Sequence, residues 1–447
     1  MVLKRKIYQK MLNWKNEGGG KTALLLEGAR RVGKTHICEQ FANNEYKSKI
    51  LIDFSTAAKE IKESIENQRE NLDLFFTQLS VYYSTPLYIR ESLIIFDEVQ
   101  LFPLARQFLK TLVADGRYDY IETGSLLSIK RNVKDILIPS EEERLEMHPL
   151  DFEEFLWAMG DEVTAPFLYD CFNGKTPVGA AVHRKVMNSY RQYLLIGGMP
   201  QSVVAYRESR DFEAAEKEKT RILALYRNDI AKYANDYEKK VVEIFDSIPE
   251  QLTKAEKKFN LSSVDKNARM REYGDAFMWL IDAMFINHCF SSADPHVGLA
   301  LSSDHTTQKL YMADTGLLVS HAFGDKDYLN NELYRAILFD KLHINEGMII
   351  ENAVAQALRT SGHRLYFYSR VDSANRENHM EIDFLIIRRN KVSPIEVKSA
   401  SYRSHSSLDK FKARFSKTTG ESYIVYTKDV MVKDGITHIP LYMSMFL

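Results

Sequence analysis

Cysteine is scarce in this chain: Cys38, Cys171 and Cys289 are its three cysteines, far apart among 447 residues. An odd and sparse set is a poor framework for disulfides and lacks the ligand spacing of a zinc site. We therefore expect reduced thiols and a cytoplasmic protein.

Long apolar runs and a strong charge of one sign are also missing. The most apolar stretch, Phe277–Ile286, has about half of the ~20 residues that a membrane-spanning helix needs, and it contains Asp282. The N-terminal residues, Met-Val-Leu-Lys-Arg-Lys-Ile-Tyr, lack the apolar core of a signal peptide. We expect no membrane partner. The formal net charge of −1 excludes a molecule that is basic throughout, although one domain can still carry a basic face.

Short apolar runs alternate with helical segments in the first third of the chain. At ~150 residues per domain, the length predicts about three domains. Strands alternating with helices predict a parallel α/β domain with three layers over residues 1–150. The predicted strands of this domain are residues 22–26, 49–54, 92–96 and 118–122.

The rest of the chain divides into two further regions. Residues 151–335 show mainly helical periodicity, and residues 241–259 and 262–287 fit the helices of a winged-helix-like unit. Residues 336–447 predict a second α/β domain, which begins with a helix at 345–360. Its other predicted elements are strands at 364–368, 381–387, 391–398 and 422–426, and a helix at 407–415.

A phosphate-binding loop follows the first predicted strand. Residues 28–35 read Gly-Ala-Arg-Arg-Val-Gly-Lys-Thr, which is the P-loop pattern of Gly, four residues and Gly-Lys-Thr. The glycines let backbone N–H groups face the phosphates, and the helix that follows adds the positive end of its dipole. Lys34 is expected to reach the β- and γ-phosphates and Thr35 to bind Mg²⁺. The predicted nucleotide-binding residues are Gly28, Ala29, Arg30, Arg31, Val32, Gly33, Lys34, Thr35, His36 and Ser125.

Two acidic residues end the third predicted strand. Leu-Ile-Ile-Phe at residues 93–96 is followed by Asp97 and Glu98. Asp97 is expected to hold Mg²⁺, and Glu98 to polarise the water that attacks the γ-phosphate. Thr123-Gly124-Ser125 ends the next strand and is either a γ-phosphate sensor or a simple turn. Arg106, Arg131 and Arg144 are the candidate arginine fingers, among which the sequence does not choose.

Three carboxylates and a lysine stand out near the C-terminus. Asp383 lies in one predicted strand, and Glu396 and Lys398 lie two apart in the next, so their side chains share a face. Glu351, on the preceding helix, can join them. Carboxylates bind Mg²⁺ through oxygen, and a lysine can activate water on a phosphodiester. The set resembles the PD-(D/E)XK nuclease pattern, with Asp383, Glu396 and Lys398 as catalytic residues and Asp383, Glu396 and Glu351 as metal ligands; the alternative is a nuclease-like fold that only binds or packs.

Positive charge is concentrated in the same region. Residues 347–447 hold 15 Lys and Arg against 10 Asp and Glu. Four basic residues on or after one predicted helix can follow a phosphate backbone, or they form a solvated helix face. These residues are Lys410, Lys412, Arg414 and Lys417.

Eight blocks of residues, in this order, resemble one family over nearly the whole chain. The family is the bacterial and archaeal AAA+-like ATPases, related to the STAND group, that carry a C-terminal domain of unknown function. The resemblance implies an ASCE-type ATPase core, a helical lid with a winged helix and a nuclease-like fold. Glu143-Arg144 departs from it, because many members have Gly-Arg there, so the role of Arg144 is in doubt. The blocks are residues 27–35, 94–100, 123–125, 148–155, 193–200, 226–230, 347–352 and 395–398.

Three hypotheses follow for the function. The first is an ATP-binding and ATP-hydrolysing switch or motor, with DNA or a protein as partner and a homo-oligomer as a possible assembly. The second is an ATP-regulated, Mg²⁺-dependent nuclease. The third is a STAND-like regulatory scaffold with slow or no turnover. The sequence does not distinguish ATP from GTP.

Overall fold

The computed structural model describes residues 3–67, 71–124, 141–254, 257–264, 266, 269–324, 334, 346–370, 379–398 and 405–447. The chain folds into two compact units, Met1–His148 and Pro149–Leu447. Within the described residues, the first unit contains one sheet and the second contains another. Ser125 and Arg131, both predicted as candidates for the nucleotide site, lie outside the described residues.

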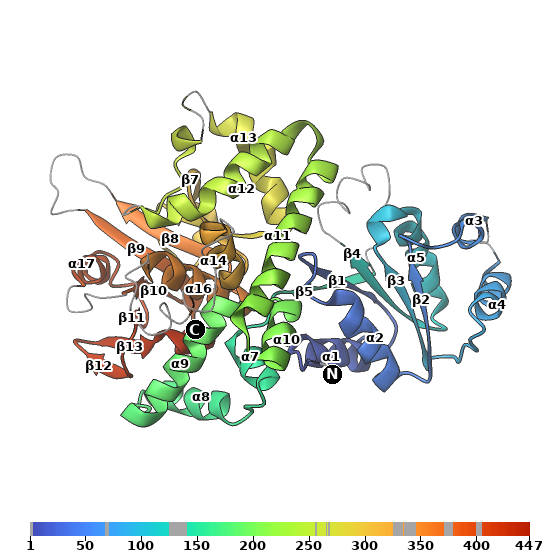
Figure 1. The fold of residues 1–447 in the computed structure, drawn as a ribbon, viewed down its shortest axis with the longest axis horizontal. Helices are drawn as coiled ribbons and strands as arrows, with labels where there is room; N and C mark the ends of the chain where they lie inside the picture. Colours follow the sequence, from blue (N-terminus) through green and yellow to red (C-terminus); the bar gives the residue numbers. More distant parts are fainter. Residues whose placement is uncertain are drawn as a thin grey trace. The chain divides into compact units, whose positions relative to one another are not determined.

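The first unit is built on a parallel five-stranded sheet in the order β2-β3-β4-β1-β5 (Figure 1). Four of its strands match the predicted ones. The edge strand β5 was not predicted, because its sequence, Glu-Glu-Arg-Leu-Glu-Met, has no apolar run. The strands are β1 (Ala23–Gly28), β2 (Ser48–Asp53), β3 (Ser92–Asp97), β4 (Asp119–Gly124) and β5 (Glu142–Met147).

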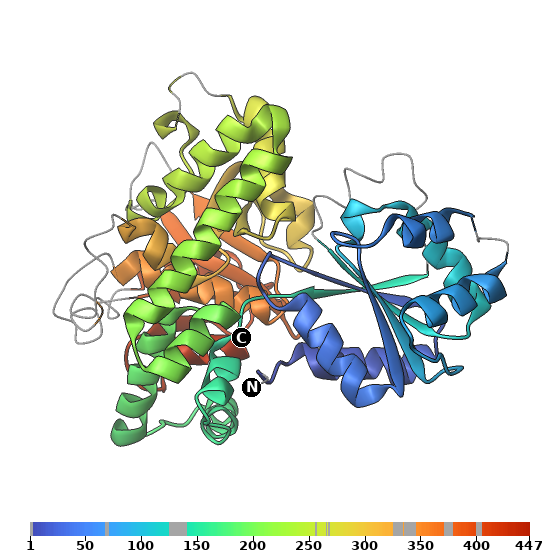
Figure 2. The same cartoon turned by 45° about the vertical axis from the view of Figure 1, so that its right-hand side comes forward.

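Helices cover both faces of this sheet, as the predicted three layers require (Figure 2). Strand side chains alternate between the two faces. On one face, the side chains of Leu25, Ile94 and Phe96 pack in an apolar core with helices α3, α4 and α5. On the other face, α2 contacts strands β1, β3 and β4. The helices are α1 (Ile7–Gly18), α2 (Lys34–Glu45), α3 (Lys59–Asn67), α4 (Leu72–Tyr82) and α5 (Leu104–Asp115), with a short 3₁₀ helix, η1 (Val99–Leu101).

The second unit contains a mixed eight-stranded sheet in the order β12-β13-β11-β10-β9-β8-β6-β7. β6 and β7 come from the stretch that periodicity predicted to be helical. They form an antiparallel pair, and β6 also pairs with β8, so the sheet extends beyond residues 336–447. The strands are β6 (Ile286–Ser292), β7 (Ser303–Met312), β8 (Leu365–Arg370), β9 (Met380–Arg388), β10 (Lys391–Val397), β11 (Tyr423–Tyr426), β12 (Met431–Lys433) and β13 (Ile436–Pro440).

The helices of the second unit precede the sheet strands and also lie between them. α16 packs on β6, β7, β8 and β10, and α17 packs on β9. The winged-helix-like unit stays a prediction: α12 and α13 match its two helices. The helices are α7 (Phe152–Ala158), α8 (Thr164–Gly174), α9 (Ala180–Ile196), α10 (Pro200–Ser209), α11 (Phe212–Tyr233), α12 (Glu238–Thr253), α13 (Met270–Asp282), α14 (Thr315–Phe323), α16 (Glu346–Thr360) and α17 (Ser406–Arg414); the 3₁₀ helices are η2 (Asn235–Tyr237), η3 (Leu261–Ser263), η4 (Leu299–Ser302) and η6 (Leu441–Phe446).

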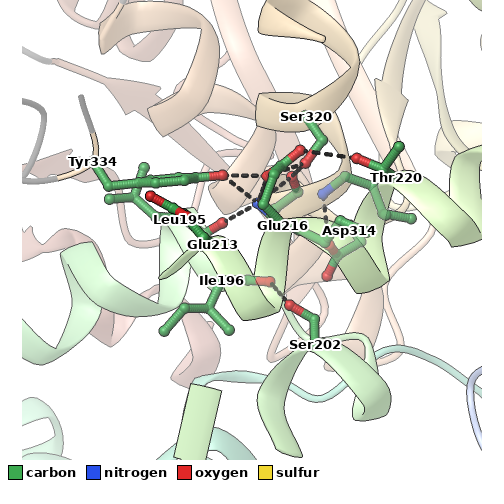
Figure 3. A network of polar contacts seen from close by, with 12 residues as sticks. Leu195, Ile196, Ser202, Glu213, Glu216, Thr220, Asp314, Ser320 and Tyr334 are labelled. Carbon is green, nitrogen blue, oxygen red and sulfur yellow. Dashed lines mark hydrogen bonds and ion pairs between the residues drawn. The ribbon is translucent and has the colours of Figure 1, made fainter. Parts of the chain in front are cut away.

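A buried polar network joins α9, α11 and α14. The ammonium of Lys219, on α11, donates to the carbonyl oxygen of Leu195 at 2.7 Å and pairs with Glu216 at 2.9 Å. Figure 3 shows Ser320 and Tyr334 turned toward the same Glu216 carboxylate, to which both hydroxyls donate. Because an unpaired buried charge is costly, these partners are what makes a buried lysine tolerable. Burial still lowers the pKa of Lys219, although Glu216 opposes that shift.

Two of the blocks that carry the family resemblance, residues 148–155 and 193–200, meet Asp314 at a close junction. Gly197 ends α9 with a φ of 80°, and a Cβ there would lie 2.3 Å from an oxygen of Asp314. Gly198 donates its N–H to Asp314, and its carbonyl accepts the N–H of Leu150 at 2.7 Å. Gly197 therefore ends the helix in a conformation that favours glycine, and the close approach explains why glycine is needed at both positions.

Candidate functional site

The P-loop connects the end of β1 to the start of α2. Gly33 has a φ of 97° and Arg31 a φ of 71°, so the backbone takes left-handed turns that let the loop curl. A Cβ on Gly28 would come within 2.4 Å of the carbonyl oxygen of Met147. α2 begins at Lys34, which places the positive end of a 12-residue helix at the loop. These are the features of an anion-binding loop.

The side chain of Lys34 folds back over this loop. Its ammonium donates to the carbonyl oxygens of Gly28 at 2.9 Å and Ala29 at 3.2 Å. Burial lowers the pKa of Lys34, and the negative charges of Glu98 and Asp97 act in the opposite direction. The lysine therefore lies within the loop and faces the acidic end of β3, where it can offer a positive charge to a phosphate.

Asp97 connects the P-loop helix to the neighbouring strand β4. One of its oxygens accepts the hydroxyl of Thr35 at 2.9 Å, and the other accepts the hydroxyl of Thr123. The strand order makes this possible, because β4 lies between β1 and β3. The Thr35 hydroxyl and the Asp97 carboxylate are already in contact, which suits a pair that binds the Mg²⁺ of a nucleotide. The phosphates of the nucleotide would supply further oxygen ligands. Thr35 and Asp97 are the residues that would hold this ion.

Glu98 lies next to Asp97 in an unusual backbone conformation. Its φ of 54° is left-handed, which is uncommon outside glycine and recurs at functional sites. The side chain is half-buried, and one of its oxygens accepts a hydrogen bond from the Nε2 of Gln100. Gln100, in η1, belongs to residues 94–100, one of the blocks that carry the family resemblance, but it was not predicted as a site residue. No sequence signal separates it from an ordinary surface glutamine.

The structure removes one arginine-finger candidate. Arg106 is 1% exposed, and its guanidinium pairs with Glu142 and, at 3.2 Å, with Glu122. A side chain fixed inside the first unit cannot reach a phosphate, so that interpretation is wrong. Arg144 is 45% exposed and pairs with Glu142 at 3.0 Å. Burial is the main cause that raises the pKa of Glu122, against the opposing charge of Arg106.

The C-terminal carboxylates come together around a lysine that the sequence did not single out. Lys309, on β7, lies 2.8 Å from Glu381, 3.5 Å from Glu351 and 3.7 Å from Asp383. Glu396, on β10, pairs at 2.6 Å with Lys398, the residue after the end of that strand, as their spacing of two predicted. We call Glu351, Glu381, Asp383 and Glu396 the carboxylate cluster.

Hydrogen bonds and two further residues complete the surroundings of this cluster. Asp383 accepts the backbone N–H of Val397 at 2.8 Å. Glu351 accepts the hydroxyl of Tyr311 at 2.6 Å and pairs with Lys257. Both Tyr311 and Lys257 lie far from the cluster in sequence, so spacing gave no signal for them.

The charges of the cluster shift each other's pKa values. Burial, together with the neighbouring charge of Glu351, raises the pKa of Asp383 to about 7. Burial also acts to raise the pKa of Glu351, but Lys309 and Lys257 outweigh it and hold that pKa below its usual value. Although burial acts to lower the pKa of Lys309, the charges of Glu351, Asp383 and Glu381 raise it.

The predicted metal ligands Asp383, Glu396 and Glu351 do not form a metal site in this arrangement. Among the described residues, no three His, Cys, Asp or Glu side chains are grouped so that they could hold a metal ion. The physical reason is that the ammonium group of Lys309 already lies among the carboxylates, within 3.7 Å of Glu351, Glu381 and Asp383. The residues present therefore do not fit Mg²⁺ at this place.

The described helices also bear on a membrane role. None of them combines the length and the apolar character that crossing a bilayer requires.

Family models match three parts of the chain. A model described as an AAA domain matches residues 20–156. Two models described as domains of unknown function match residues 187–327 (DUF8612) and 346–443 (DUF4143). No curated protein matches the chain.

Several solved structures are distantly similar. The Walker-type ATPase PABY2304 of Pyrococcus abyssi is 16% identical with a TM-score of 0.42, covering 72% of this chain and 96% of its own. The Aeropyrum pernix ORC1 protein in complex with DNA is 12% identical with a TM-score of 0.27, covering 73% and 93%. AMPPCP-bound DnaA from Aquifex aeolicus is 12% identical with a TM-score of 0.27, covering 63% and 88%. Because these values are low, we draw no conclusion from the three structures.

The AAA match and the site geometry agree on the first unit, which is an ATPase-like P-loop domain similar to AAA domains. The chain thus combines this domain with two regions that match only domains of unknown function.

Proposed function

We propose that the chain binds ATP with Mg²⁺ at residues 28–35 and hydrolyses it. The observation that carries this proposal is the contact of Asp97 with both Thr35 and Thr123. It brings the P-loop, the acidic strand and the intervening strand to one point, with Glu98 beside it. Such an arrangement holds a nucleotide and also supplies a carboxylate for water.

Each residue has a separate part in the proposed reaction. Backbone N–H groups of residues 29–33 and the N-terminus of α2 bind the phosphates, and Lys34 moves from the Gly28 and Ala29 carbonyls to the β- and γ-phosphate oxygens. Thr35 and Asp97 would hold Mg²⁺, which would neutralise part of the phosphate charge. Glu98 accepts a proton from the attacking water as that water bonds to the γ-phosphorus, while the bond from this phosphorus to the β–γ bridging oxygen breaks and ADP leaves.

Gln100 supports a distinction between a resting and a working state of Glu98. In the structure its amide holds the Glu98 carboxylate, so one carboxylate oxygen is already occupied when a water molecule approaches. Hydrolysis requires the carboxylate to face the γ-phosphate. ATP binding is expected to compete with this hydrogen bond, as in a switch whose nucleotide state changes a local contact.

The predicted nuclease-like fold of residues 336–447 remains part of the proposal, with DNA or a protein as partner. The basic residues on and just after α17 support a nucleic-acid contact. Arg414 and Lys417 are exposed, whereas Lys410 and Lys412 are half-buried and donate to backbone carbonyls at 3.4 Å. Charge of this kind binds phosphates without reading sequence.

Nucleotide binding and phosphate release test the proposal together. We expect the wild-type chain to bind MgATP and release phosphate, Lys34→Ala to lose binding, and Glu98→Gln to bind ATP with turnover lower by roughly 10²–10⁴-fold. Glu63→Gln, an exposed glutamate of the same unit, is the matched control. Unchanged turnover in both site variants contradicts the proposal. Binding without turnover in the wild type favours the STAND-like scaffold instead, and parallel titrations with GTP identify the nucleotide.

A further inference from the structure

Lys309 is a buried charge that the nucleotide site does not use. Its side chain is 1% exposed, although it lies on β7 among residues that read as an ordinary polar segment. An ammonium group in a protein interior needs paired charges around it, because its lost hydration is otherwise not replaced. The partners of Lys309 therefore indicate its role.

Those partners surround it from two elements. Glu351 comes from α16, and Glu381 and Asp383 come from β9, all within 3.7 Å of the Lys309 nitrogen. This is the donor set that would converge on a divalent cation in an oxygen-ligated site. The ammonium lies where such a cation would have to lie.

The second oxygens of Asp383 and Glu351 are also occupied. That of Asp383 accepts the N–H of Val397, and that of Glu351 pairs with Lys257, while the hydroxyl of Tyr311 donates to the Glu351 oxygen that pairs with Lys309. Lys398 in turn pairs with Glu396. Three ammonium groups thus face four carboxylates, which leaves little negative charge to attract a metal ion.

We infer that Lys309 is the cation of the carboxylate cluster, and that the cluster joins β7 to α16 and β9 instead of binding Mg²⁺. Neighbouring contacts belong to the same junction. The side chain of Asn352 accepts the N–H of Met312 at 2.8 Å, and that of Gln356 accepts the N–H of Thr315 at 2.8 Å. One face of α16 is therefore bound to β7 by an ion pair and the Asn352 amide, and to the start of α14 by the Gln356 amide.

The position of Lys309 bears on the nuclease hypothesis. Lys309 lies in residues 187–327, and the carboxylates lie in residues 346–443, so the two regions of unknown function complete one site between them. A chain that neutralises the cluster with its own lysine has no place for the metal that phosphodiester cleavage would need. The nuclease-like pattern then has a structural role.

Mn²⁺ binding followed by electron paramagnetic resonance tests the inference in the full chain without nucleotide. Asp97→Asn serves as the common background, so that the P-loop does not contribute. We expect no Mn²⁺ site that depends on Asp383 while Lys309 is present. Lys309→Met is expected to acquire such a site, which a further Asp383→Asn change removes. A site that is present with Lys309 and lost on Asp383→Asn overturns the inference.

The stability of the same variants gives a second, independent measurement. Lys309→Met is expected to unfold at a clearly lower urea concentration than the wild type, whereas Lys239→Met, which removes an exposed lysine of α12, should leave the midpoint unchanged. If Lys309→Met unfolds at the wild-type midpoint, the inference is wrong. If the variant does not fold at all, the Mn²⁺ comparison of chains with and without the Asp383→Asn change, both of which retain Lys309, still decides it.

Discussion

The burial of Arg106 changes the role that we assign to this residue. From sequence it was a candidate arginine finger, but its guanidinium is enclosed with Glu122 and Glu142 inside the first unit. Removing one partner of a buried ion pair leaves an uncompensated charge, which costs about 3–5 kcal/mol. Its role is therefore to hold α5 to β4 and β5.

We predict that Arg106→Ala lowers the free energy of unfolding by about 3–5 kcal/mol, measured by urea denaturation of the full chain. Lys110→Ala, an exposed change on the same helix, is the control and should stay within about 0.5 kcal/mol. A variant that is as stable as the wild type but loses ATP turnover would restore the arginine-finger role.

His321 gives a residue-scale prediction about pH. Its side chain, on α14, is only 7% exposed, and its Nε2 lies 3.0 Å from the carbonyl oxygen of Phe245, with Asp246 and Arg227 nearby. Burial lowers the pKa of His321 despite the Phe245 carbonyl and Asp246, which favour the charged form. The unfolded chain thus binds the proton more readily than the folded one.

Stability should therefore fall as pH decreases through about 6.5, the usual histidine pKa, and continue to fall until the lower folded pKa is passed. We predict that His321→Gln shows a weaker loss between pH 7 and pH 5 than the wild type, in urea midpoints measured at each pH. Parallel curves for the two chains would contradict this.

From sequence alone, the approach of the P-loop to Asp97 could be predicted, whereas that of Lys309 to the carboxylate cluster could not, for a physical reason. The P-loop and the acids after β3 are local patterns, and parallel strands bring their carboxyl ends to one edge. Lys309 belongs to a different segment, and lysine is almost never fully buried without a partner. Its place depends on tertiary packing, which spacing does not reveal.

At the scale of elements, the predicted strands were found where burial produces a clear pattern. β1 and β3 are buried along their whole length and contain apolar runs, whereas β4 is equally buried but carries Asp119 and Glu122. β5 is an edge strand with exposed glutamates, and β7 carries polar residues through Lys309. Such strands are determined by their neighbours in the sheet, and no period of two marks them.

The end of α9 allows a test of the close junction. Gly197→Ala must place a methyl group 2.3 Å from an Asp314 oxygen at a φ of 80°. Gly160→Ala is the matched control, because its φ is 89° and nothing lies within 4 Å of the new Cβ. We predict that Gly160→Ala costs about 1 kcal/mol of unfolding free energy and that Gly197→Ala costs several times more. Equal costs, measured by urea denaturation, would show that the junction yields readily.

For the whole molecule, two compact units imply that unfolding need not be a single transition. MgATP binds only the folded first unit in our account, so it should stabilise that unit alone. At a concentration 100-fold above Kd the gain is ~2.7 kcal/mol, which corresponds to roughly 5–10 °C for a unit of this size. We predict such a shift by calorimetry in the wild type and none in Lys34→Ala. An equal shift in both would place ATP elsewhere.

The central claim is that Glu98, beside the Asp97 contact, makes this chain hydrolyse ATP. Single-turnover phosphate release from prebound MgATP tests it most directly, because it separates chemistry from binding and product release. The account predicts that Glu98→Gln retains ATP but releases phosphate roughly 10²–10⁴-fold more slowly than the wild type and the Glu63→Gln control. Release from Glu98→Gln at the wild-type rate would contradict it.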